Sequence, residues 1–250
     1  MSLGAHLIEL RKRLFIAALA IVVGMIAGYI VSDWVLAALI RPISELAAEQ
    51  GRNASLNFTD VSSAFDLRIQ IAFTVGVVVS SPVWLYQLWA FVMPGLKKTE
   101  KRYAVGFLAA AVPLFLAGCA AGWFVLPHMV TLLTGFAPEG TTALLTARSY
   151  FDFVLKLVLA IGIAFVLPVF LVLLNFAGVL SAAAILKSWR IAILAITLFT
   201  AIATPAADVM SMFLLAIPMV LLYFTAAGIA WLHDRRARRA AERFDVELAV

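Results

Sequence analysis

The residues in this chain that could do chemistry are two acids surrounded by basic residues. Glu9 lies in HLIELRKRLF, beside Arg11 and Lys12 and four residues ahead of Arg13, and Glu100 lies in GLKKTEKRYA. Taken singly, Glu9 can form an i,i+4 pair with Arg13, and Glu100 suits the first turn of a helix. Taken together, they could bind a cationic peptide, because guanidinium groups pair with carboxylates in a planar, bidentate way. Both interpretations stay open from these residues alone.

Other chemistry finds little support in the sequence. The three histidines lie far apart, at His6, His128 and His233, and no Walker A, glycine-rich nucleotide loop, nucleophile elbow or His-Glu-x-x-His motif occurs. The lone cysteine, Cys119, rules out an internal disulfide and is expected to fill space in a helix. We therefore expect no enzyme, no metal site and no cofactor.

The composition indicates that these residues are positioned by membrane helices. The chain has 250 residues, of which 64% are hydrophobic and only 13% charged, whereas soluble domains carry about 25% charged residues. Its mean hydropathy is +1.05. Six apolar runs are long enough to predict six transmembrane helices: residues 14–32, 69–96, 103–138, 157–186, 191–207 and 209–233. The fold class is therefore an all-α membrane protein, with the six-span unit at 1–232 and a basic tail at 233–250.

The basic residues predict the orientation of this bundle. Fourteen of the nineteen lie at the N-terminus, in the 2–3 and 4–5 connections and in the tail, while eight of the fourteen acids lie on the opposite side. By the positive-inside rule, both termini are expected to be cytoplasmic. The net charge of +5 is then a topology signal, and no nucleic-acid partner is expected.

The helix boundaries follow from proline, glycine and charge. We expect the first helix over about 14–39, a short surface helix starting at Pro42, the second over 66–92 and the third over 101–126. A loop over 127–147, a fourth helix from Arg148 with an Asp152–Lys156 pair, and a fifth of only about 15 residues follow. Two interpretations of the prolines within the spans stay open, since they are either ordinary membrane prolines or bend the helices into a curved, partly open bundle. They are Pro82, Pro113, Pro168 and Pro218.

The middle of each predicted helix carries no charged residue, which argues against an ion-coupled pump. A polytopic small-molecule or ion transporter remains the alternative function. A scaffold that only organises other helices is a third.

Several segments resemble the TatC family, the membrane receptor subunit of the twin-arginine protein translocase. The segment HLIELRKRL resembles that family's N-terminal signature. Two others are similar to its second helix with the following loop and to its helix 5–6 hairpin: SSPVWLYQLWAFVMPGLKKTEKR and ATPAADVMSMFLLAIPMVLLY. LKSWR and the six-span layout fit as well, so the resemblance covers about 6–232.

The resemblance implies a function and a set of site residues. Members bind twin-arginine signal peptides of folded cargo proteins. In the lipid bilayer they form homo-oligomers within a receptor complex, which also contains small single-span (TatA/TatB-like) subunits. Transport uses the proton-motive force. The resemblance assigns signal-peptide binding to Glu9, Glu100, Arg11, Arg13, Phe91 and Pro94. It assigns structural or translocation-related roles to Pro42, Pro82, Gln87 and Asp208.

This sequence departs from the family at positions thought to face the partner helices. Val166 stands where a glutamate is usual, Met212 follows Ser211 where a Ser-Gln pair is common, and Phe224 fills the place of a later glutamate. Our hypothesis is that this partner-helix groove binds by apolar packing, with Thr204, Ser211 and Thr225 as its remaining polar contacts. Val166→Glu should then alter co-purification of the single-span subunits.

Overall fold

The structure is a computed structural model that describes residues 3–49, 56–57, 63–92, 101–135, 145–204 and 209–248. These residues are almost entirely α-helical, which confirms the predicted class. The helices are α1 Leu3–Ile30, α2 Ser32–Glu49, α3 Ser63–Val79, α4 Ser81–Val92, α5 Lys101–Gly135, α6 Ala147–Phe176, α7 Ala182–Lys187, α8 Trp189–Ala203 and α9 Val209–Leu248. Two short strands, β1 Leu56–Asn57 and β2 Leu145–Thr146, pair in parallel, which the sequence did not predict.

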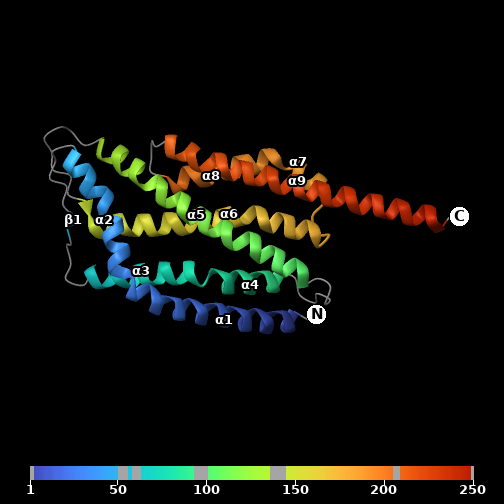
Figure 1. Ribbon diagram of the computed structural model, residues 1–250, viewed down its shortest axis with the longest axis horizontal. Coiled ribbons are helices and arrows are strands. Elements are labelled where there is room, and N and C mark those ends of the chain that lie inside the picture. The colour runs from blue at the N-terminus through green and yellow to red at the C-terminus, as the bar shows by residue number, and fades with distance from the viewer. Residues whose placement is uncertain are drawn as a thin grey trace.

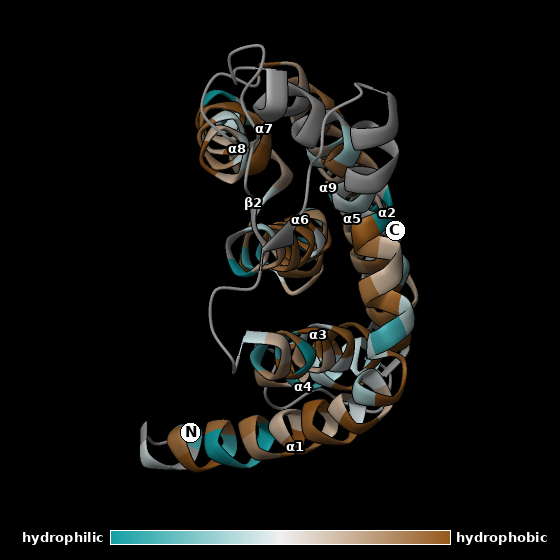
Figure 2. Ribbon diagram, turned by 90° about the vertical axis from the view of Figure 1, so that its left-hand side faces the viewer, coloured by the Kyte–Doolittle hydropathy of each residue, from teal (hydrophilic) through white to brown (hydrophobic). Residues whose placement is uncertain are grey.

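The long helices lie side by side along one direction (Figure 1). Both termini lie at one end of the bundle, called here the terminal end, and α2 with the strand pair lies at the other, the loop end. Seen along this direction, the helices follow a curve from α1 to α7 and α8, as Figure 2 shows. Side chains of α3, α6 and α5 form a core cluster near the loop end, and side chains of α4, α5 and α6 form a second one.

Four helices in the described part of the chain are long and apolar enough to cross a membrane: α1, α5, α6 and α9. The bent pair α3–α4 would be a fifth span, whereas α8 has 15 residues and reaches only about 22 Å. The short helix expected before the last hairpin is therefore present. The count of six spans remains a prediction.

The first helix differs from the prediction at both ends. It begins at Leu3 and gives way at Val31 to α2, which starts at Ser32 and runs through Pro42 to Glu49. The expected helix start at Pro42 was therefore wrong. The backbone hydrogen bonds from Val31 to Ala27 and from Val35 to Val31 carry the helix across the junction, so the chain needs no new start.

The break between α3 and α4 bends the chain by 60° and lies at Ser80, two residues before Pro82. Proline lacks a backbone N–H and is compatible with the first turn of a helix, so α4 can start here. The indole Nε1 of Trp84 donates to the Val77 carbonyl oxygen at 2.9 Å and so supplies a hydrogen bond beside the break. The bend expected from Pro82 is confirmed.

The other prolines do not interrupt their helices. Pro113, Pro168 and Pro218 lie inside α5, α6 and α9, each of which is one unbroken helix. The loop expected over 127–147 was also partly wrong, because α5 continues through Pro127 to Gly135. Neighbouring helices and local adjustment can satisfy the carbonyl groups that these prolines leave free.

Helices α1 and α3 approach closely because glycines face one another. A Cβ atom built on Gly24 would lie 2.7 Å from the carbonyl oxygen of Gly76, and one on Gly28 would lie 2.5 Å from that of Ala72. Small residues at such positions let membrane helices pack backbone to backbone. This contact fixes α1 against the helix pair that carries Gln87 and Phe91.

At the terminal end, Asp234 of α9 joins three segments. Its Oδ2 accepts from the backbone N–H of Ala182 at 2.8 Å, at the first residue of α7, and its Oδ1 accepts from Nδ2 of Asn175 at 3.0 Å. Asn175 also donates to the Leu180 carbonyl at 2.8 Å. Helix α9 continues without a break into the basic tail predicted at 233–250 and is helical up to Leu248.

At the loop end, polar side chains join α2, α3 and α6. Arg68 of α3 pairs with Asp33 of α2 at 2.5 Å, and Asp152 pairs with Lys156 one turn along α6. The predicted Asp152–Lys156 pair is therefore confirmed. Gln70 of α3 also donates to Asp152, which joins α3 to α6.

Candidate functional site

Two helix faces meet around Glu9 at the terminal end. His6, Glu9 and Arg13 are three and four residues apart in α1, so they share one face of that helix, and Gln87 and Phe91 are four apart in α4. The His6 and Phe91 rings stack with their centroids 4.6 Å apart and an interplanar angle of 24°. We call these five residues the α1–α4 face.

Among the described residues, Arg13 alone holds the Glu9 carboxylate. Its Oε1 accepts from Arg13 Nε at 3.0 Å and from Arg13 Nη2 at 2.6 Å. Nη1 of the same guanidinium reaches Oε1 of Gln87 at 3.5 Å, at the outer limit of a hydrogen bond. The side chains of Arg13 and Glu9 are only 24% and 22% exposed, so the expected i,i+4 pair is confirmed and is largely shielded from solvent.

The second carboxylate oxygen of Glu9 is free to accept a hydrogen bond as far as the described residues are concerned. Glu9 Oε2 is buried and has no hydrogen-bond partner among the described residues. A buried acceptor without a partner costs about 1–3 kcal/mol, and more for a charged group. A donor that reached this oxygen would remove the cost, and a guanidinium supplies several N–H groups in one plane.

An apolar hollow of about 330 Å³ adjoins this face. Arg13, Gln87 and Phe91 border it, and residues of α1, α3, α4 and α6 form the remainder of its lining. These remaining residues are apolar, except that Trp84 carries a polar N–H. That N–H is already donated to Val77, so a ligand in the hollow would meet an apolar surface. The α1–α4 face thus places a carboxylate, a shielded guanidinium and an apolar hollow together.

The remaining residues predicted for peptide binding, and those predicted for structural or translocation roles, are placed as follows. Arg11 is exposed on α1, two residues from Glu9 and therefore on another face. Pro82 lies in the first turn of α4, and Pro42 lies inside helix α2, at the loop end. Glu100, Pro94 and Asp208 lie outside the described residues.

The residues predicted for the partner-helix groove do not gather in one place. Val166 is 2% exposed and packs in the cluster with Phe107 and Phe115 of α5, whereas Phe224 on α9 is 42% exposed. Thr204 is buried and donates to the Thr200 carbonyl at 2.9 Å. Met212 is half-buried, and the side chain of Ser211 lies outside the described residues.

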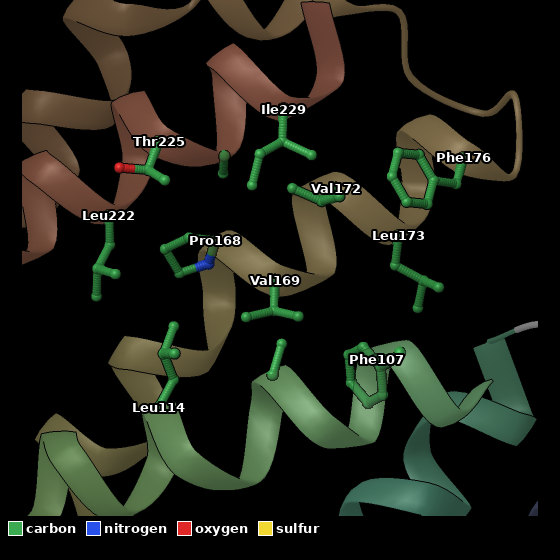
Figure 3. Close-up of a pocket in the computed structure, with 13 residues that line it drawn as sticks. Phe107, Leu114, Pro168, Val169, Val172, Leu173, Phe176, Leu222, Thr225 and Ile229 are labelled. Atoms are coloured by element: carbon green, nitrogen blue, oxygen red, sulfur yellow. The ribbon is translucent and has the colours of Figure 1, made fainter. Parts of the chain in front are cut away.

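An apolar pocket of about 450 Å³ lies near these residues, between α5, α6 and α9 (Figure 3). Phe107, Val169 and Ile229 are among its walls, and Thr225 lines it as well. The Thr225 hydroxyl donates to the Leu221 carbonyl at 2.8 Å, so its donor is already used within its own helix. Val166 and Phe224 are not among the lining residues.

Two contacts of the α1–α4 face were not foreseen from the sequence. The His6–Phe91 stack and the approach of Arg13 to Gln87 both join residues more than seventy positions apart. The sequence feature that could have indicated these contacts is the spacing on each helix, since polar or aromatic residues recur at three- and four-residue steps on both. Which two faces meet depends on the α1–α3 glycine contact, which spacing does not reveal.

Comparison with known proteins gives a consistent result. A family model described as "Sec-independent protein translocase protein (TatC)" matches residues 5–218. The Sec-independent protein translocase protein TatC of Xylanimonas cellulosilytica is 47% identical over 96% of this chain and 87% of its own length. TatCy of Bacillus subtilis is 31% identical over 96% and 93%. A crystal structure of the twin arginine translocase receptor TatC in DDM superposes with a TM-score of 0.76 at 33% identity, covering 90% of this chain and 99% of that one.

Proposed function

The chain belongs to the TatC family of Sec-independent protein translocase proteins, and from this premise we propose that it is a signal-peptide receptor. The family is a non-enzymatic transport family, and its members and the apolar helices here indicate an integral membrane protein. In the proposal, the chain is the core subunit of a twin-arginine translocase that exports folded proteins with the proton-motive force. The solved relative that is named a twin arginine translocase receptor supports this role.

The observation that carries the proposal is the open oxygen of Glu9. A carboxylate whose Oε1 is bound by Arg13 and whose Oε2 is buried without a partner among the described residues is suited to a second guanidinium. The hollow beside it suits the apolar segment of a peptide. Glu100, Arg11 and Pro94 are proposed to complete the site with Arg13 and Phe91, while Pro42, Pro82, Gln87 and Asp208 keep the structural or translocation roles that the resemblance assigns.

The proposed placement has six spans in the inner membrane with the terminal end in the cytoplasm. The basic residues of α1, α7 and the tail support this orientation, since positive charge favours the cytoplasmic side. The proposed partners are single-span TatA/TatB-like subunits and further copies of the chain. Since Val166 is buried and Phe224 exposed, the apolar partner surface is proposed on α9 around Phe224 and Met212, with Val166 acting through the packing behind it.

Crosslinking tests the receptor role directly. A twin-arginine signal peptide with a photoactivatable residue beside the Arg-Arg pair is added to membranes holding the full chain, and its Lys-Lys counterpart is added in parallel. We expect labelling by the Arg-Arg peptide to exceed that by the Lys-Lys peptide. Removing a charged hydrogen bond of about 1.5–3 kcal/mol by Glu9→Gln should lower labelling roughly tenfold or more.

Asp33→Asn is the matched control. Asp33 also forms an Asp–Arg pair, at the loop end, so its loss changes the same net charge without touching the α1–α4 face. Equal labelling by both peptides that survives Glu9→Gln combined with Glu100→Gln would overturn the receptor assignment. Such a result would favour a transporter or a scaffold instead.

A further inference from the structure

A pocket of about 540 Å³, called here the slot, lies between α6 and α8, with α9 as its floor. Helices α6 and α8 both pack on α9, and Figure 2 shows them as separate members of the curved array. Leu167 and Leu171 form part of one wall, and Ile191 and Ala195 form part of the other. Tyr223 in the floor donates its hydroxyl to the Ile185 carbonyl at 2.5 Å, so the slot presents an apolar interior.

The polar end of the slot is the break between α7 and α8. Ser188 lines the slot there and makes no side-chain cap hydrogen bond to α8. Lys187 and Arg190 flank it, and both are exposed. The Arg190 guanidinium lies 5.4 Å from the centroid of the Trp189 ring, a combination typical of a membrane interface.

The rim formed by Lys187, Ser188 and Arg190 is electrostatically positive. Neither basic side chain pairs with a carboxylate among the described residues. Asp234, at the same end of the bundle, directs its oxygens to Ala182 and Asn175. An anion at the rim would therefore meet two cations that have no acidic partner in the described part of the chain.

The size and the apolar lining of the slot suit a flexible apolar chain. The volume falls within the range of about 300–1,000 Å³ that small-molecule sites occupy. An acyl chain is both apolar and flexible, as the lining between α6 and α8 requires.

We propose that this slot binds a phospholipid with an anionic headgroup. One acyl chain lies between α6 and α8, and the phosphate lies at Ser188, Lys187 and Arg190. Helix α8 reaches about 22 Å, less than the roughly 30 Å of hydrocarbon, so its basic start is drawn toward the acyl region. A bound phosphate there keeps both cations paired. The site is separate from the α1–α4 face and does not depend on the receptor role.

Photolabelling in vesicles tests this site. The full chain is reconstituted with phosphatidylglycerol that carries a photoactivatable group in one acyl chain, and in parallel with the equivalent phosphatidylcholine. Labelled peptides are mapped by mass spectrometry, and we expect labels at 167–174 and 191–196 with phosphatidylglycerol. Each basic residue near an anionic lipid changes binding about fivefold, so the two at the rim should make labelling by phosphatidylcholine about 25-fold weaker.

Two variants separate the slot from its rim. Ala195→Phe fills the slot and should abolish labelling there, while Lys187→Gln should lower the phosphatidylglycerol preference about fivefold. Lys156→Gln, at the loop end, is the matched control and should change nothing. If Ala195→Phe fails to fold by gel filtration, the Lys187→Gln result alone decides the question.

Several results would overturn the proposal. One is labelling that spreads over all exposed apolar faces, including that of α1 at Phe15 and Leu19, with no preference for the slot. Another is equal labelling by phosphatidylglycerol and phosphatidylcholine, since that leaves no role for the basic rim. A third is capture of a second polypeptide at residue 195 in place of lipid.

Discussion

Replacing Asp234 should release α7 from the bundle. Helix α7 has only six residues, too few for an isolated helix to be stable in water. It is held by Ser181, whose hydroxyl accepts from Ala184 N at 3.2 Å, and by Asp234, which accepts from Ala182 N at 2.8 Å. The negative charge also lies at the N-terminus of α7, where the helix dipole favours it.

The expected magnitude follows from the hydrogen bonds that Asp234→Ala removes. Two hydrogen bonds to a charged acceptor contribute about 1.5–3 kcal/mol each. The Asp234 side chain is 21% exposed, so water recovers part of this, and the expected loss is about 2–4 kcal/mol. Asp234→Asn keeps an oxygen for one donor and should lose only about 1–2 kcal/mol.

Hydrogen exchange on the detergent-purified chain measures this loss where it occurs. Amide exchange over 182–187 should speed up about 30-fold or more in Asp234→Ala, and less in Asp234→Asn, while exchange in α1 and α3 stays unchanged. Arg236→Ala is the control, because Arg236 is exposed two residues away on the same helix. Exchange rates in Asp234→Ala that match those in Arg236→Ala would refute the reasoning.

Three further predictions concern packing. Gly76→Val should destabilise the fold by about 1–3 kcal/mol in thermal denaturation, since even a Cβ there lies 2.8 Å from a backbone nitrogen of α1, whereas Gly106→Ala meets nothing within 4 Å and should be silent. Trp84→Phe should cost about 1–3 kcal/mol by leaving the Val77 carbonyl beside the break without its indole donor, and an unchanged melting midpoint would contradict this. Val166→Glu should reduce the yield of folded chain and co-purification of single-span subunits, because it buries a carboxylate among aromatic side chains; normal recovery of both would contradict the buried position.

Sequence patterns predicted the ion pairs and helix ends that depend on residues close together in the chain. The Glu9–Arg13 and Asp152–Lys156 pairs follow from four-residue spacing, and both are present. The start of the fourth helix near Arg148 was also found, because a segment rich in Thr, Gly and Pro precedes it. Helix α8 is as short as its apolar run required.

Contacts between distant segments could not be predicted in this way. The tail beyond His233 reads as a charged extension, yet Asp234 within it bonds to the start of α7, 52 residues earlier. Likewise, Pro42 and Pro127 read as helix boundaries, although both lie inside helices whose neighbours tolerate them. Of the site, Glu9 and Arg13 were found from the residues, while Gln87 and Phe91 were known only from the resemblance.

Because α9 is one unbroken helix, the direction in which Asp234 points around the helix axis is set by the number of residues before it. Tyr223, Ala227, Ala230 and Asp234 recur at steps of four, three and four residues, so they form one stripe, of which the first three pack against α7 and the last bonds to it. Because each residue turns an α-helix by about 100°, one residue inserted after Ala230 would swing the carboxylate a quarter-turn away while leaving the sequence around it intact. The length of the apolar part of α9 thus sets the direction in which the charged side chains beyond it point. An insertion or deletion there would turn those side chains around the helix axis.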